Sequence, residues 1–162
     1  MTQEKRVALV TGACRGIGRA IAHELGRQGR IVIGTATSKS GAEKIDADLK
    51  ANGVEGAGMC LNVTDQASID EVLKTIGERF GAPTILVNNA GITRDNLLMR
   101  MKEEEWDSVM DTNLKSVYRV SKACLRGMTK ARFGRIVSIS SVVATMGNLG
   151  QTNYAAAKAG ME

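Results

Sequence analysis

The sequence predicts an α/β fold in which helices cover both faces of a doubly wound parallel sheet. Short runs that are apolar almost throughout alternate with longer stretches that are apolar along one helical face only. Such strands are typical of parallel sheets buried on both sides, and right-handed crossovers then place helices on each face. The first apolar run also leads directly into a glycine-rich loop, residues 11–18, which precedes a helical stretch.

Five strands are expected, with a helix after each of the first three. The strands are residues 6–10, 31–33, 58–63, 84–87 and 135–139. The apolar face of the first helix comprises Ile17, Ala20, Ile21 and Leu25. That helix ends near Gly29, the second helix covers residues 41–51, and Thr64 or Asp65 caps the third. The buried side of the third helix comprises Ile69, Val72, Leu73, Ile76 and Phe80.

A single long helix is expected between the fourth and fifth strands. Its apolar stripe comprises Trp106, Val109, Met110, Val117, Val120, Cys124 and Met128. Asn113 falls on this stripe, where an unpaired amide would cost about 1–3 kcal/mol. A core asparagine with satisfied hydrogen bonds and a functional asparagine both fit that position.

The last residues, 154–162, resemble the opening of another helix, and the chain stops within about three turns of its start. We therefore expect residues 1–162 to form a single domain that is truncated at its C-terminus. Nothing downstream of residue 162 is present to form the wall of a substrate pocket over the strand ends.

Composition indicates an ordinary globular domain and disfavours several other classes. Of the 162 residues, 24% are charged and 43% hydrophobic. No apolar run approaches the ~18 residues that span a bilayer, and the first six residues lack the apolar stretch of a secretory signal. A cytoplasmic protein without membrane contact is expected.

Cysteine and histidine usage disfavours a metal site. The three cysteines form no Cys-x-x-Cys pair, and the single histidine, His23, is expected on the surface of the first helix. No metal is therefore expected. The net charge of +5 favours acidic partners, but scattered basic residues and 3% aromatics provide no platform for nucleic acid. A phosphate-bearing cofactor, an acidic protein and a merely solvated basic surface remain open.

The glycine-rich loop predicts a dinucleotide site. Gly12 permits a tight turn, while Gly16 and Gly18 allow phosphate and helix to approach the backbone. The pyrophosphate would then meet the positive end of the first helix. The spacing is G-x-x-x-G-x-G, not the more widespread G-x-G-x-x-G.

The turn after the second strand favours NADP over NAD. NAD sites usually place an acidic residue about 20 residues beyond the loop, yet residues 34–39 contain no carboxylate. Arg15 offers a rigid fork of donors for a 2′-phosphate, and Thr37 and Ser38 offer hydroxyls. A polar turn without ligand preference is the alternative.

Two further segments carry chemistry. Residues 88–91, Asn-Asn-Ala-Gly, follow the fourth strand at the edge where such sheets bind ligands, although a purely structural turn is also consistent. Tyr154 and Lys158 lie one helical turn apart on one face, so the ammonium can stabilise a phenolate. Together with the glycine loop, this pair predicts hydride transfer between a nicotinamide and a carbonyl.

In this order, the glycine loop, residues 88–91, and Ser141 with Tyr154 and Lys158 resemble the short-chain dehydrogenase/reductase family. The similarity covers the whole chain and implies a Rossmann-type, NADP-binding domain that lacks its last strands and substrate lid. Residues 89–101, and Gly147-Asn148 before Gly150-Gln151, resemble the bacterial branch that reduces 3-oxoacyl groups on acyl carrier protein in fatty-acid synthesis.

The resemblance implies a role for each of four catalytic residues. Tyr154 would be the general acid, and Ser141 would hydrogen-bond the substrate carbonyl. Lys158 would hold the nicotinamide ribose, and Asn113 would support a water-linked proton path. The implied NADP(H) contacts are Gly12, Ala13, Cys14, Arg15, Gly16, Ile17, Gly18, Thr37, Asn62, Val63, Asn89, Ala90, Gly91, Tyr154, Ala155, Ala156, Ala157 and Lys158. Cys14 departs from the serine common at its position.

The resemblance also implies partners. Carrier proteins are acidic, and Arg132, between Lys130 and Arg135, matches a family docking position. Charges that simply complement the C-terminal end of the long helix are the plainer alternative. A homotetramer is implied through the long helix and the helix that holds Tyr154. Reduction of another small ketone, and NADP binding without turnover, are the remaining functional alternatives.

Overall fold

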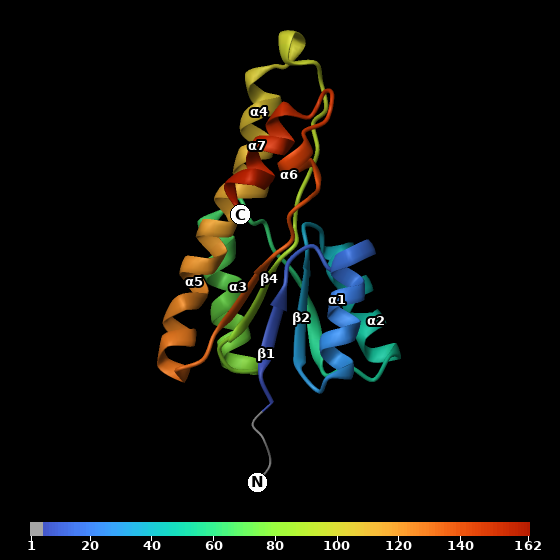
Figure 1. Cartoon of the computed structure of the whole chain (residues 1–162). Helices are drawn as coiled ribbons and strands as arrows, with labels where there is room; N and C mark the ends of the chain where they lie inside the picture. Colours follow the sequence, from blue (N-terminus) through green and yellow to red (C-terminus); the bar gives the residue numbers. More distant parts are fainter. Residues whose placement is uncertain (1–4) are drawn as a thin grey trace.

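A five-stranded parallel sheet forms the centre of the protein, which this computed structural model describes over residues 5–162 (Figure 1). The strands are β1 (Val7–Val10), β2 (Ile31–Ala36), β3 (Gly56–Cys60), β4 (Ile85–Asn88) and β5 (Arg135–Ser138). Their order across the sheet is β3-β2-β1-β4-β5. The chain adds β2 and β3 on one side of β1 and then crosses over to add β4 and β5 on the other side, so the strand order reverses between β1 and β4. The predicted doubly wound α/β fold is confirmed.

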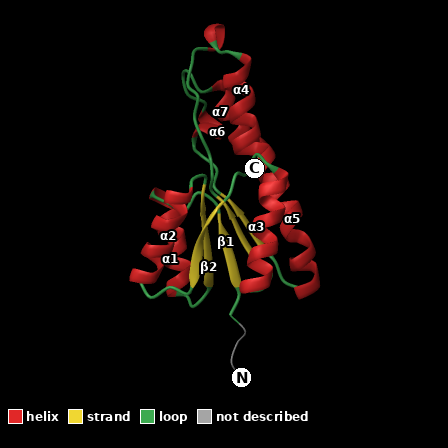
Figure 2. Ribbon diagram, turned by 180° about the vertical axis from the view of Figure 1, so that it is seen from behind, coloured by secondary structure: helices red, strands yellow, loops and turns green. Residues whose placement is uncertain are grey.

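Helices cover both faces of this sheet (Figure 2). On one face lie α1 (Gly16–Arg27) and α2 (Lys39–Ala51), and on the other lie α3 (Gln66–Arg79) and α5 (Ser116–Ala131). Neighbouring strand residues therefore enter different cores. Leu9 packs with residues of α3 and α5, whereas Val10 packs with residues of α1 and α2.

Side-chain caps begin two of the helices, and one of these caps was predicted. The Asp65 side chain accepts a hydrogen bond from Ala67 N and caps α3, which decides between the two expected caps. Ser38 caps α2 in the same way through Gly41 N. Because Ser38 begins a helix, α2 starts at Lys39, two residues earlier than expected.

The third strand lies earlier than predicted. It covers Gly56–Cys60, whereas Leu61 and Val63 are buried but lie outside the strand. Asn62 ends it, because its side-chain oxygen accepts hydrogen bonds from both the backbone and the hydroxyl of Thr64. The apolar run in the sequence therefore continues into a turn.

The predicted single long helix is interrupted. It consists of α4 (Glu103–Val109), a π-helical segment η2 (Met110–Lys115) and then α5. The expectation of a uniform helix was wrong at residues 110–115. A π turn adds a residue to the helical repeat, and here it contains Asn113, whose side chain bonds to the loop after β4.

Short helices and a loop extend beyond the carboxyl edge of the sheet (Figure 1). Besides α4, they are η1 (Leu98–Arg100), α6 (Val143–Met146) and α7 (Thr152–Gly160). Asn153, which is fully buried, fastens α7 by donating hydrogen bonds to Arg94 O and Glu105 O. Within the described residues, no helix has both the length and the apolar character to cross a membrane.

Candidate active site

The glycine loop is held by the two strands at the reversal point of the sheet. The Thr11 hydroxyl donates to Val87 O and accepts from Asn89 N and Ala90 N, each of the latter at 3.0 Å. The Asn89 amide in turn donates to Thr11 O and Gly12 O, both at 3.0 Å. Asn89 therefore shapes the loop, which is one of the two roles that the sequence left open for this segment.

The loop conformation depends on glycine at two points. Gly12 has φ +67°, in the region that favours glycine. At Gly18, a Cβ would lie 2.2 Å from Gly12 O and 2.5 Å from the Asn89 amide nitrogen. The first turn of α1 therefore packs directly against the loop, and the close approach expected from the sequence is present.

A groove of about 770 Å³ runs along the carboxyl edge of the sheet from this loop. Its walls combine predicted cofactor contacts with neighbours that the motifs did not single out. The predicted residues are Gly12, Cys14, Arg15, Gly16, Ile17, Gly18, Thr37, Asn62, Val63, Asn89, Ala90 and Gly91. The additional residues are Thr35, Ala36, Leu61, Thr64, Ile92 and Thr112. Position in the sequence could have indicated these additional residues, because most of them end a strand or follow one at this edge of the sheet.

Six predicted cofactor contacts do not line this groove. Ala13 is 3% exposed and packs in the core beneath α1 and α2. Ala157 is fully buried, while Ala155 and Ala156 are half-buried. Tyr154 and Lys158 line the neighbouring pocket instead.

The end of the groove near β2 is free of acidic side chains. None of its lining residues in the described chain is Asp or Glu, and Arg15 and Thr37 both reach it. Ser38 is not among the lining residues of this groove, and its oxygen accepts a hydrogen bond from Gly41 N at 3.1 Å. This end can accommodate a phosphate without repulsion from a carboxylate.

A second pocket, of about 460 Å³, continues from the groove to Tyr154 and Lys158. The two share five lining residues, which are Arg15, Ile17, Asn89, Gly91 and Ile92. An extended molecule that enters beside the glycine loop can therefore follow one continuous surface to the Tyr154 side chain.

Lys158 is 5% exposed and has an ordered position. Its ammonium donates to Ile139 O at 2.7 Å, beyond the end of β5, and lies 5.7 Å from the centre of the Tyr154 ring. Burial lowers the pKa of Lys158, because the charged form loses hydration. The cation thus lies beside the half-buried phenol, as the spacing of the two residues predicts.

Two serines follow β5 near this pocket. Ser140 lines the pocket, and its hydroxyl lies 2.6 Å from the Glu162 carboxylate and 3.4 Å from Lys158 O. Ser141, the predicted residue, is not among the lining residues. Its oxygen accepts a hydrogen bond from Val143 N at 3.2 Å, which leaves its O–H free to donate.

Asn113 is fully buried with its amide satisfied. Its oxygen accepts from Ile92 N and its nitrogen donates to Ile92 O, both at 2.8 Å. It lines neither cavity, whereas its neighbour Thr112 lines the groove. In this structure Asn113 is a core asparagine that fixes Ile92, a residue common to both cavities.

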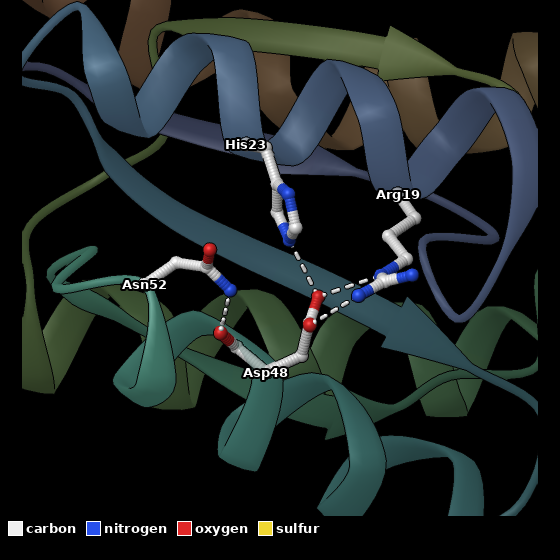
Figure 3. A network of polar contacts seen from close by, with 4 residues as sticks. All are labelled: Arg19, His23, Asp48 and Asn52. Carbon is white, nitrogen blue, oxygen red and sulfur yellow. Dashed lines mark hydrogen bonds and ion pairs between the residues drawn. The ribbon is translucent and has the colours of Figure 1, made fainter.

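A polar cluster beside the groove was not expected from the sequence (Figure 3). The Asp48 carboxylate accepts from Arg19 Nε and Nη2 at 2.9 and 2.7 Å, and His23 Nε2 lies 2.5 Å from it. The hydrogen bond from Arg19 is the largest cause that lowers the pKa of Asp48 to about 2. His23 lies on α1 as expected, and its contact with Asp48 joins α1 to α2.

Arg132, the predicted docking residue, lies at the opposite edge of the sheet from this site. Arg132 follows α5 with φ +50° and precedes β5 by three residues, so it lies at the edge where the strands begin. Tyr154 lies beyond the opposite edge. Lys130, Arg132 and Arg135 are all exposed.

Comparison with known proteins identifies relatives along the whole chain. A profile of the family described as short chain dehydrogenase matches residues 6–162. The chain is 67% identical over 162 residues to the 3-oxoacyl-[acyl-carrier-protein] reductase FabG of Pseudomonas aeruginosa. Proteins of the same name from Vibrio cholerae and Escherichia coli are 64% and 63% identical over 161 residues. These matches cover 99–100% of this chain but only 65–66% of each relative, just under two thirds of their length.

Proposed function

The chain belongs to the short-chain dehydrogenase family, and on that premise we propose that it provides the cofactor groove and the proton donor of an NADPH-dependent reductase. The family predicted from the sequence motifs is thereby confirmed. The proposed substrates are 3-oxoacyl groups carried on acyl carrier protein, as the names of the relatives indicate. The product would be the corresponding 3-hydroxyacyl group.

The observation that carries this proposal is the continuity of the two cavities. A dinucleotide is long, and the groove provides separate surfaces for its parts. Arg15 and Thr37 would hold the 2′-phosphate, Asn62 and Val63 the adenine, and the start of α1 the pyrophosphate. The shared walls at Asn89 to Ile92 then lead toward Lys158, which would hold the nicotinamide ribose. When bound, NADPH supplies the hydride.

The protein supplies the proton. Tyr154 would donate it to the carbonyl oxygen, and the adjacent ammonium of Lys158 would stabilise the phenolate that remains. Ser141 would orient the carbonyl through its O–H, because its oxygen accepts from Val143 N while the O–H has no acceptor among the described residues. Asn113 would contribute by fixing Ile92, and a water-linked proton path would begin from that fixed main chain.

Carrier docking and assembly are further parts of the proposal. The exposed cations near Arg132 are suited to an acidic protein. Arg132→Glu should therefore weaken reduction of a carrier-bound substrate more than reduction of a small 3-oxoacyl thioester. Equal losses on both substrates would count against docking at this position. We further propose a homotetramer for the full-length enzyme, with a substrate lid in the third of the relatives' length that has no counterpart here.

The competing function is nucleotide binding without turnover. It is favoured by one observation, namely that the chain spans just under two thirds of its relatives. NADPH oxidation with an acetoacetyl thioester, measured on this chain and on any longer protein that contains it, separates the two. Activity in the longer protein alone would assign binding to these residues and turnover to the whole.

Tyr154→Phe tests the chemistry in whichever form is active. We expect turnover to fall by about 100-fold or more, because the general acid is lost, while NADPH affinity changes by less than about threefold. Tyr118→Phe is the matched control, since the Tyr118 hydroxyl is exposed on α5 and lies only near Lys122. Unchanged turnover in Tyr154→Phe would remove the proposed role.

A further inference from the structure

A third cavity, of about 600 Å³, lies at the edge where the strands begin, opposite the nucleotide groove. Four separate segments form it: the residues that enter β1, the turn before β2, the loop between α3 and β4, and the end of α5. This edge is at the bottom of the molecule in Figure 1. No residue that lines this cavity also lines the groove or the Tyr154 pocket.

The charge of this cavity is entirely positive. Lys5, Arg6, Arg30 and Lys130 line it, and none of its described lining residues is acidic. Lys5 is paired with Glu55 at 2.7 Å. For the other three cations, the structure of residues 5–162 contains no ion pair. A group of cations without counterions favours the binding of an anion.

Aromatic rings hold part of this charge in place. The chain contains two phenylalanines, and both line the cavity. The Arg6 guanidinium carbon lies 3.3 Å from the centre of the Phe133 ring, and Arg135 lies 4.6 Å from the same ring. A guanidinium stacked on a ring keeps its in-plane N–H groups free. Arg6 is therefore preorganised to donate hydrogen bonds to an anion.

A buried hydroxyl lies in the same wall. Thr84 is 9% exposed, lines the cavity, and has a side-chain oxygen without a hydrogen-bond partner among the described residues. Buried hydroxyls are normally paired. The Thr84 oxygen is itself inaccessible to solvent, so this hydroxyl adds a dipole behind the wall and not a direct contact.

We propose that this cavity is a binding site for a small molecule that carries two or more linked phosphate groups. The volume lies within the range of small-ligand pockets. Arg6, Arg30 and Lys130, the three unpaired cations, match the charge of a di- or triphosphate. The shared chemistry is the phosphoanhydride, whether free or attached to a nucleoside. This ligand would bind independently of the proposed reductase chemistry, because the two sites occupy opposite edges of the sheet.

The test is a ¹H–¹⁵N NMR titration of the chain with inorganic tripolyphosphate in the presence of saturating NADP⁺. We expect saturable shifts at the amides of Arg6, Ala82 and Phe133, with little change around Gly12. The double variant Arg30→Gln/Lys130→Gln should weaken binding by roughly tenfold or more, since two charge-assisted contacts are removed. A second titration with adenosine triphosphate distinguishes the sources, because tighter binding than tripolyphosphate indicates a nucleoside ligand and equal binding a free polyphosphate.

The matched control is Lys74→Gln/Arg126→Gln, which removes the same charges from exposed positions on α3 and α5 outside the cavity. It should retain the parental affinity. Equal weakening in both double variants would overturn the proposal by showing general attraction to a basic protein. Absence of saturable shifts at this edge, or equal affinity for an acidic polyglutamate peptide, would also overturn it.

Discussion

Strands β1 and β5 belong to the same sheet and are separated only by β4, yet they differ sharply in burial. Every residue of β1 is buried, whereas three of the four residues of β5 are exposed, including Ile136 and Val137. The same contrast extends beyond the strands. The apolar residues Val142, Met146 and Leu149, which follow β5, are 75–86% exposed. The nucleotide half, which holds the glycine loop and the groove, is therefore packed within the chain, while the Tyr154 half, which comprises β5, α6 and α7, keeps apolar side chains exposed.

Buried polar side chains hold the Tyr154 half instead. Asn153 fastens α7 to the loop after β4 and to α4. Lys158 fastens the same helix to the residue after β5. The groove is therefore held mainly by close packing, whereas the position of Tyr154 is held by the few hydrogen bonds that fasten α7.

The largest expected effect breaks the nucleotide half. In Gly18→Val, the new Cβ would overlap Gly12 O and the Asn89 amide, so the loop must open. We expect the free energy of unfolding to fall by about 3 kcal/mol and NADPH affinity to fall by about 100-fold. Urea unfolding and fluorescence titration measure these effects. Gly77→Ala, at an exposed site on α3 where a Cβ meets nothing, is the control and should be neutral or stabilising.

Asn113→Ala should weaken both halves at once. It leaves Ile92 N and Ile92 O without their partners in a half-buried position, and Ile92 lines both cavities. We expect the free energy of unfolding to fall by about 2 kcal/mol. Loss of turnover without loss of stability would instead identify a purely catalytic asparagine.

Lys158→Met should separate function from stability. Burial of the ammonium is costly, and its bond to Ile139 O offsets part of that cost. The free energy of unfolding should therefore change by less than about 1 kcal/mol, while reductase turnover in the longer protein falls by about 100-fold. A destabilisation much larger than this, measured by urea unfolding, would make Lys158 chiefly a structural clamp.

The smallest expected effect concerns acid stability of the α1–α2 contact. Because Arg19 and His23 hold the pKa of Asp48 near 2, below its ordinary value of about 3.9, the folded state favours the carboxylate. Its contribution is present above about pH 4 and is lost as the pH falls toward 2. Asp48→Asn should cost about 1 kcal/mol at pH 5 and almost nothing near pH 2, as a partly solvated network allows. An equal cost at both pH values, from urea unfolding, would contradict this linkage.

Local pattern predicted the fold and the glycine loop well, because both depend on periodicity and on residues adjacent in the chain. The π segment around Asn113 was not predictable in this way, since it depends on a bond to Ile92, 21 residues earlier. The pairing of His23 with Asp48 likewise joins two helices across 25 residues. The role of Ser140 at the pocket depends on how the chain turns after β5, which the apolar pattern does not determine.

Cofactor preference can be measured on this chain alone, because the groove proposed to determine it is lined by residues between 12 and 112. Fluorescence titration of the 162-residue chain should give saturable binding of NADPH and at least about tenfold weaker binding of NADH, as lost charge-assisted contacts to a 2′-phosphate imply. Arg15→Gln should remove most of that preference. Equal affinity for the two cofactors, or no saturable binding of either by a folded chain, would contradict the account.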